Sequence, residues 1–455
     1  MKKLAVAGAA LLMMVILWMR SAVAAPLTLE QCISEALRYS PELAAVRHDI
    51  AAASFEITKQ RGTTLPSLSS QLSAYEINGA PVTPFSILNF STPENPISRK
   101  ANAHWDPAAM QIVDATYPLY LYGSVMGLNH PPVVAAAEDQ LDEQELTVVL
   151  AEQKVVLDVF TAFSQVVWYR NWARLDETIV TQSQQALDIV TDQVSLGLKI
   201  PQSIELAKSQ LAAGQQAAAA ARHNAANATS ELATIMGRGS DAPLELDNSQ
   251  RALPPLPPLK EFLARTMPTH PALKIQQAKV EIARQQYRVD QAAILPTVSL
   301  NTTFAGGEDI EYINGNSNHR NPTAFLAYLE VDAPLFDFGE RRAAINESSE
   351  KISSATERTR QLELDLRKAI TQDYEQIGDL ETQLAVLQRD LVKAGNDFDL
   401  ARAQRAEGMI DALKLTDSEL ALLYLRSALE YQQYERRILY AELQNLSGGA
   451  WRWIQ

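Results

Sequence analysis

The sequence predicts a mixed fold, in which long α-helices pack as coiled coils and short amphipathic strands contribute to a membrane β-barrel. Three observations support this prediction. Two long stretches free of proline keep apolar residues in steps of three and four. Four short stretches alternate apolar with polar residues. Both patterns occur twice in the same order, which indicates an internal duplication.

The longer of the two proline-free stretches runs from about Glu340 to Glu407, with glycine only at Gly378 and Gly395. Roughly 68 residues at ~1.5 Å rise make a rod of ~100 Å, which a single globular domain cannot surround. The rod must therefore pack on other rods. Its a/d seam consists of Ile377, Leu380, Leu384, Leu387, Leu391, Ala394, Phe398 and Ala401.

A second rod is predicted from about Val133 to Leu196, a stretch that also lacks proline and glycine. Gly197 ends this rod and Gly408 ends the other, as expected for a residue that readily adopts a positive φ. The seam of the second rod has one polar interruption, Gln153. Its members are Leu146, Val149, Gln153, Val156, Phe160, Phe163 and Val167.

Alternating patterns predict strands at about 64–77, 110–122, 296–305 and 324–338. Residues 78–108 and Gly306–Pro322 read as polar loops. Shorter helices are predicted at 28–62, interrupted at Pro41, and at about 201–236 and 411–446. A proline-rich linker follows Ala252.

Matching landmarks divide the chain into a first repeat over 26–258 and a second over 259–455. Leu65-Pro66 corresponds to Leu295-Pro296, and each second strand leaves through a Pro-to-Gly segment, 118–123 and 334–339. Each predicted strand has about ten residues, the length of a tilted strand that crosses a bilayer. Four strands cannot close a barrel, and an open edge in lipid is costly, so several chains must share one barrel.

Residues 1–25 have the features of a secretory signal peptide, with cleavage after Ala24 or, as the alternative, after Ala25. Removing its three basic residues takes the formal charge from −14 to −17. This acidity argues against a nucleic-acid partner. The lone cysteine, Cys32, excludes an internal disulfide and is expected to be a helix-core thiol. The alternative, a lipid-anchored N-terminus, is disfavoured by the preceding Glu30 and Gln31.

This order of motifs resembles the TolC family of outer membrane efflux proteins over essentially the whole exported chain. The resemblance rests on the duplicated helix-strand-strand-helix order, the Leu-Pro pairs, the strand exits and the glycine turns. It implies a homotrimer that closes a twelve-stranded outer-membrane barrel, continuous with an α-helical tunnel in the periplasm of a Gram-negative bacterium. It further implies partners: outer-membrane lipid, a periplasmic adaptor and an inner-membrane pump.

The resemblance also implies two sites. The first is formed by the helix tips, where an adaptor would dock. We call Leu196, Gly197 and Leu198 the first tip, and Glu407, Gly408 and Met409 the second tip. The second site is a periplasmic gate at Lys414 and Asp417. Family members often carry acidic residues at both of these positions, so the closed state is expected to differ here, and a solvated helix residue is the alternative for Asp417.

No catalytic motif, cofactor site or metal-ligand spacing is recognisable, and no enzymatic activity is expected. Aromatic residues near the strand ends are either membrane-girdle residues or packing residues: Tyr117, Tyr120, Tyr122, Phe325, Tyr328, Phe336 and Phe338. The leading functional hypothesis is a passive exit duct for an efflux or type I secretion system. The alternative is a periplasmic coiled-coil scaffold or adaptor without a barrel. Drugs, metal ions, solvents and secreted proteins all use such ducts, and a passive wall need not recognise them.

Overall fold

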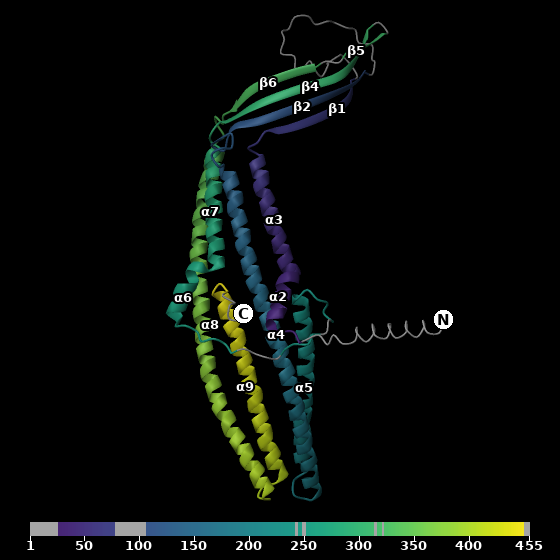
Figure 1. Ribbon diagram of the computed structural model, residues 1–455, viewed down its shortest axis with the longest axis vertical. Coiled ribbons are helices and arrows are strands. Elements are labelled where there is room, and N and C mark those ends of the chain that lie inside the picture. Colours follow the sequence, from purple (N-terminus) through teal and green to yellow (C-terminus); the bar gives the residue numbers. More distant parts are fainter. Residues whose placement is uncertain are drawn as a thin grey trace, which may run out of the picture. The chain divides into compact units, whose positions relative to one another are not determined.

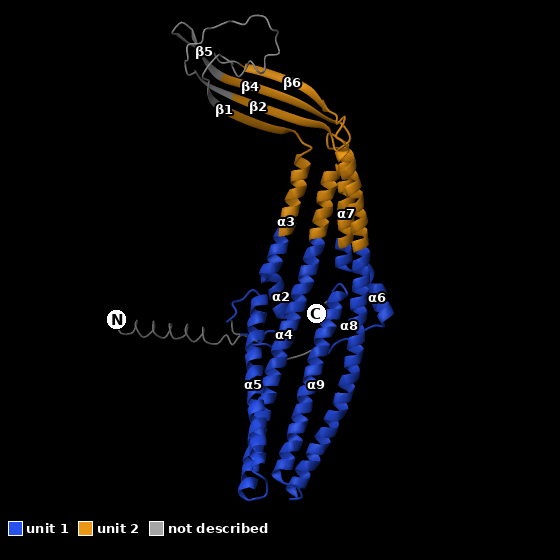
Figure 2. Ribbon diagram, turned by 180° about the vertical axis from the view of Figure 1, so that it is seen from behind, with its two compact units in different colours: residues 1–48, 145–275, 359–455 blue, residues 49–144, 276–358 orange. Residues whose placement is uncertain are grey.

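The computed structural model describes residues 26–77, 106–241, 244–247, 252–313, 316–320 and 323–449. The expected signal peptide and most of the expected loop at 78–108 lie outside these residues. The described chain forms two compact units that each take segments from both halves of the sequence (Figure 2). Unit 1 comprises Met1–His48, Glu145–Ile275 and Thr359–Gln455, and unit 2 comprises Asp49–Gln144 and Gln276–Arg358.

The elements follow one another in a similar order twice (Figure 1). The first series is α2 (Leu29–Tyr39), α3 (Pro41–Gly62), β1 (Ser67–Ile77), β2 (Asp106–Leu121), β3 (Ser124–Val125), α4 (Pro132–Ser195) and α5 (Gln202–Ile235). The second is α6 (Leu259–Thr266), the 3-10 turn η2 (Met267–Thr269), α7 (Pro271–Ala292), β4 (Thr297–Ile313), β5 (Asn316–Arg320), β6 (Thr323–Asp332), α8 (Glu340–Ala406) and α9 (Ala412–Leu446).

Unit 2 contains an antiparallel sheet in the order β1-β2-β4 (Figure 1). On the other side of β4, its first part pairs with β6 and its last part pairs with β5. Leu68 lies opposite Ala115, Thr302 opposite Ala115 on the other side, and Ala327 opposite Thr302. The register between β2 and β4 shifts between Pro118 and Tyr120. Proline has no N–H to donate to the ladder, which accounts for a bulge at this point.

The two faces of this sheet differ in polarity. One face exposes large apolar side chains from several strands: Leu68, Leu72, Leu300, Phe304, Phe325, Leu329 and Val331. On the other face Thr303 Oγ1 donates to Asp114 Oδ1 at 2.6 Å, and Asn301 Nδ2 donates to Glu330 Oε2 at 2.6 Å. The predicted period of two is therefore present, with one face apolar and the other hydrogen-bonded.

Several strand boundaries differ from the prediction, among them the start of β2 at Asp106, which lies inside the expected loop at 78–108. The strand expected at 324–338 is β6, which ends at Asp332, because Pro334 cannot donate to a ladder and the chain turns at Phe338 and Gly339. The segment expected as a loop from Gly306 to Pro322 instead extends β4 to Ile313 and forms β5. Its polar composition concealed backbone pairing, which depends on the neighbouring strand rather than on apolar side chains.

The long helices of unit 1 bury part of each predicted seam. On α8, Ile377, Leu380, Leu384 and Ala401 are buried, and on α4 Val156, Phe160, Phe163 and Val167 are buried. The Val149 side chain is exposed, and the remaining apolar seam residues are half-buried: Leu146, Leu387, Leu391, Ala394 and Phe398. The polar interruption at Gln153 is buried and donates from Nε2 to the Gly448 carbonyl at 2.8 Å, which satisfies one of its polar atoms.

Each half of the sequence builds its own core in unit 1. Cys32, Val159, Val166, Leu232 and Met236 belong to a cluster formed by α2, α4 and α5. A second cluster joins α6, α8 and α9 and includes Phe262, Ile370, Ile377 and Leu443. Contacts of Val156 and Phe160 with Ala441 connect the two halves. The prediction of Cys32 as a core thiol is confirmed, and burial raises its pKa to about 12.

Among the described residues, no helix combines the length and apolar composition needed to cross a lipid bilayer.

In unit 1 the buried side chain of His270 hydrogen-bonds to the last residue of α9. His270 accepts a hydrogen bond from the Ala272 N–H at Nδ1, at 3.1 Å, so its Nε2 carries the proton and donates to the Leu446 carbonyl at 2.9 Å. Burial of the ring lowers the pKa of His270. Burial outweighs the hydrogen bond to the Leu446 carbonyl, which acts on the pKa in the opposite direction. A second proton would also remove the Nδ1 acceptor.

We predict that His270 makes the folded state sensitive to acid. The pKa of His270 is lower in the folded state than the value of about 6.5 expected after unfolding. Unfolded chains therefore bind the proton first as the pH falls, and the free energy of unfolding decreases below about pH 6.5. His270→Gln should lower the melting temperature at pH 7.5 but flatten its decline towards pH 5.5, measured by circular dichroism in detergent. The control is His223→Gln on the exposed face of α5, and equal pH slopes for all three proteins would disprove this role.

Candidate functional site

The first tip is a glycine-terminated helix end. Gly197 has a φ of +72°, its N–H donates to the Val194 carbonyl at 3.0 Å, and the Leu198 N–H donates to the Gln193 carbonyl at 2.8 Å. This pair of reversed bonds is a Schellman motif, which satisfies the last carbonyls of α4. Nothing lies within 4 Å of the position a Cβ would take at Gly197. The glycine is required by its backbone conformation and not by crowding.

The second tip repeats the same arrangement at the end of α8. Gly408 has a φ of +73°, with its N–H bonded to the Arg405 carbonyl at 3.1 Å and the Met409 N–H bonded to the Gln404 carbonyl at 2.8 Å. Asp411 then caps α9 by accepting the Lys414 N–H at Oδ1, at 2.9 Å. Both halves therefore reverse direction by the same device.

The two tips lie side by side at one end of unit 1 (Figure 1). Gln193 Nε2 of α4 donates to Asp411 Oδ2 at 3.1 Å, which links the first half to the second. The N–H of Lys414 is the main cause of the lowered pKa of Asp411, and Gln193, Lys199 and Arg405 add to it. Farther from the tips, Gln182 Nε2 donates to Glu419 Oε1 at 3.2 Å.

The tips expose apolar side chains. Leu196 is 72 % exposed, Leu198 is 71 % exposed and Met409 is 61 % exposed. Ile200, at 65 %, extends this surface and was not predicted from the sequence. A group of exposed apolar residues at the end of a rigid hairpin is typical of a surface that contacts a partner.

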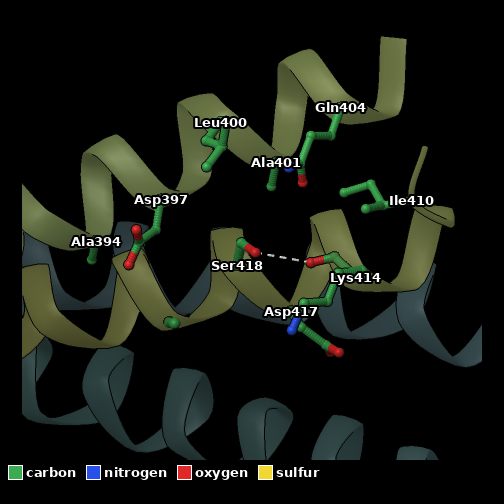
Figure 3. A pocket seen from close by; sticks show the side chains of 10 residues that line it. Ala394, Asp397, Leu400, Ala401, Gln404, Ile410, Lys414, Asp417 and Ser418 are labelled. Atoms are coloured by element: carbon green, nitrogen blue, oxygen red, sulfur yellow. Dashed lines mark hydrogen bonds between the residues drawn. The ribbon is translucent and has the colours of Figure 1, made fainter. Parts of the chain in front are cut away.

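A groove of about 380 Å³ runs between α8 and α9 next to the second tip (Figure 3). It contains both predicted gate residues, Lys414 and Asp417, together with Asp397 of α8. Although part of the Asp417 side chain is exposed, the loss of surrounding water raises its pKa. The charges of Lys199 and then Lys414 lower it. The sequence suggested Lys414 alone as the counter-charge and gave no indication of Lys199, which comes from the other half.

Aromatic residues also gather where the second repeat leaves the sheet in unit 2. Phe336 and Phe338 are exposed, with ring centroids 4.6 Å apart. Tyr122 and Phe338 both have a φ of 53° and each precedes a glycine of positive φ. Exposed rings beside an exposed apolar sheet face are compatible with a membrane interface.

In the part of the chain that the structure describes, no three His, Cys, Asp or Glu side chains are placed to hold a metal ion. A second groove in unit 2 is lined by His130, Glu138, Asp139 and Arg288, among others. His130 Nε2 lies 3.1 Å from Glu138 Oε2, and Arg61 Nη2 lies 2.8 Å from Glu138 Oε1. The contact between Arg61 and Glu138 pairs opposite charges locally.

Comparison with known families agrees with this geometry. A family model described as outer membrane efflux protein matches residues 32–238 and 265–449. The chain belongs to this family. The predicted resemblance is confirmed, and so is the location in the outer membrane with the helical part in the periplasm. Members are channel proteins rather than enzymes, and a scaffold or adaptor without a membrane domain is not favoured.

Solved structures share the fold at low sequence identity. A CusC structure is 17 % identical, with a TM-score of 0.71 and coverage of 93 % of this chain and 92 % of that one. VceC from Vibrio cholerae is 17 % identical, with a TM-score of 0.70 and coverage of 92 % and 96 %. The open state of the Neisseria gonorrhoeae MtrE outer membrane channel is 15 % identical, with a TM-score of 0.71 and coverage of 92 % and 89 %. No curated protein matches the chain. The predicted fold class is confirmed by these structures.

We predict that the tip glycines are required for their backbone conformation. Gly197→Ala or Gly408→Ala should destabilise the local turn by about 1 kcal/mol, because an L side chain is strained at positive φ. The measurement is the free energy of local opening at the tip from hydrogen exchange. The control is Gly378→Ala inside α8, where a Cβ also meets nothing within 4 Å. That change should stabilise its helix by up to ~1 kcal/mol. Equal effects of all three changes would refute the assignment.

Proposed function

We propose that three copies of this chain form one exit duct, which receives cargo from an inner-membrane pump through a periplasmic adaptor. The observation that carries the proposal is the combination of an exposed apolar sheet face with helical hairpins that end in exposed apolar tips. β1 and β6 each have a strand neighbour on one side within the described sheet. Pairing of β1 with β6 of the next copy would satisfy both edges.

The two faces of the sheet support this arrangement. In a closed barrel the apolar face would contact lipid, and the face that carries the Thr303–Asp114 and Asn301–Glu330 hydrogen bonds would line the interior. An apolar band against lipid and a polar interior are what an aqueous duct requires. The number of copies, three, comes from the family resemblance.

Docking at the tips is the second part of the proposal. Leu196, Leu198 and Met409 are exposed, and the Gln193–Asp411 hydrogen bond brings both tips into one surface. Apolar residues with a polar rim suit an α-helical partner. The adaptor would contact this surface, and the duct itself need not recognise the cargo.

The third part is a gate at Lys414 and Asp417. In a threefold assembly Asp417 would repeat around the axis, and like charges on a narrow ring repel unless cations or basic groups intervene. Lys414 of a neighbouring copy is the proposed counter-charge between chains. Lys199 would act within the chain, because its charge already lowers the pKa of Asp417 there.

We predict that a charge at either tip prevents docking. Gly197→Asp or Gly408→Asp should abolish transport while the protein still inserts into the outer membrane. Asp tolerates positive φ better than most residues, so the added charge is the main change. The matched control is Gly197→Asn, which keeps the turn without the charge and should retain most transport. If transport survives both Asp variants, the tips are turns without a docking role.

We predict that Lys414 and Asp417 restrict the resting duct. Lys414→Ala combined with Asp417→Ala should raise the resting conductance in planar bilayers and lower cation selectivity, and Asp417→Ala alone should remove most of the selectivity. Asp397→Ala removes an equal charge from the α8 side of the groove and is the control. Wild-type conductance and selectivity in the double variant would mean that Asp417 is an ordinary solvated helix residue.

A further inference from the structure

Five aromatic rings meet between α4 and α9 in unit 1, well separated along α9 from the gate. Trp168 lies at the centre, with ring centroids 4.7 Å from Tyr434, 5.0 Å from Trp172 and 5.5 Å from Tyr431. The Tyr434 and Trp172 rings are stacked on it, at interplanar angles of 11° and 18°. Tyr169 contacts both tryptophans. We call these five residues the aromatic cluster.

The aromatic cluster is not a closed core. Tyr434 is half-buried, and this burial raises its pKa to about 12, but Tyr431 is 41 % exposed. Tyr424 lies seven residues before Tyr431 on α9 and is 55 % exposed. Seven residues are close to two helical turns, so both tyrosines lie on one face of α9. Asp417 lies seven residues earlier again, on the same face.

Two carboxyl groups are hydrogen-bonded to residues of the aromatic cluster. The Tyr431 hydroxyl hydrogen-bonds to Glu435, one turn away on α9. Asp176 of α4 is buried and takes a hydrogen bond from Trp172, and its Oδ2 has no hydrogen-bond partner. Glu430 is also near, and the charges of Arg426 and Arg174 act on it. Arg426 and Arg174 partly offset the charge of Glu430, whereas Asp176 keeps one oxygen without a hydrogen-bond partner. A ligand with positive charge would therefore meet the carboxyl groups of Asp176 and Glu435 as well as the electron-rich faces of the rings.

Ring faces attract cations through the quadrupole of the π-system, most strongly for tryptophan. Planar ligands gain stacking area on the same rings. A ligand that is both planar and cationic gains stacking and cation–π attraction together. A planar anion gains only stacking, and an aliphatic cation gains only cation–π attraction. The chemistry of the cluster thus selects a class of small molecule.

We propose that the aromatic cluster, with Tyr424 and Glu435, is a binding surface for planar aromatic cations. Its place on the same face of α9 as Asp417 would put it along the path of cargo, and this part rests on the proposed function. The binding itself requires neither the adaptor nor the pump. A wall with such a surface would hold aromatic cations briefly and favour them over other solutes.

The test is the binding of ethidium to the purified full-length protein in detergent, measured by fluorescence anisotropy and corrected for empty micelles. Phenanthridine, a neutral molecule with the same ring system, and tetraethylammonium, a cation without rings, are the ligand controls, added as competitors. Ethidium should bind at least about tenfold more tightly than either competitor, because each of these lacks one of the two attractive terms.

The variant is Tyr424→Leu combined with Tyr431→Leu, which removes the exposed rings and leaves the half-buried Trp168–Tyr434 stack. It should weaken ethidium binding about tenfold. Tyr39→Leu, at a tyrosine that is 56 % exposed on α2, is the matched control and should bind as the wild type does. Glu435→Gln should weaken ethidium binding a few-fold and leave phenanthridine unchanged. Near-wild-type circular dichroism spectra would establish that all variants fold.

The proposal is overturned if ethidium does not bind, if the double variant binds as the wild type does, or if phenanthridine binds equally well. Gly197→Asp should bind ethidium normally even where it abolishes transport. A failure of the docking proposal and a failure of this one are therefore distinguishable. If another chain of the assembly covers the aromatic cluster, ethidium will not bind, and this result also counts against the proposal.

Discussion

The constraint on which the rest of the structure depends is the hydrogen-bonding demand of the outer strands. β1 pairs with β2 and β6 pairs with β4, so within the described residues the sheet ends in two edges whose outer backbone groups have no strand partner. Each such group would cost several kcal/mol in lipid, where water cannot satisfy it. The exposed apolar face adds a second demand. Leu68, Leu72 and Phe325 would expose apolar surface to water unless lipid or another protein surface covered them. Both demands are met when several copies share one closed sheet.

The helical half of the molecule follows from duplication. Each half ends a long helix with the same Schellman turn, and the Gln193–Asp411 hydrogen bond joins the two turns. One chain therefore presents two similar hairpins at one end of unit 1. The two repeats differ in their charged residues near the tips. The second repeat supplies Asp411 and Asp417, and the first supplies Lys199, whose charge lowers the pKa of both. These contacts between the repeats depend on both hairpins being present in one chain.

Much of the fold could be predicted because its signals are local. Unbroken apolar periodicity and the glycine at the end placed α8 within one residue of its observed limits, Glu340 and Ala406. The extension of β4 to Ile313 was missed because pairing with β5 leaves little trace in a polar segment. Contacts between the halves were also missed. The Gln193–Asp411 bond and the stacking of Trp168 on Tyr434 join residues far apart in the sequence, and neither residue type signals its partner.

The most direct test of the account is the mass of the assembled protein in mild detergent, measured by native mass spectrometry alongside circular dichroism. The open edges of β1 and β6 predict that folded chains with full strand content occur only in an assembly of several chains, and the family resemblance predicts that this assembly has three. Dissociation by harsher detergent should remove strand signal together with the assembly. A stable single chain that keeps its full strand content in detergent would contradict the account, because its sheet edges would then need no partner.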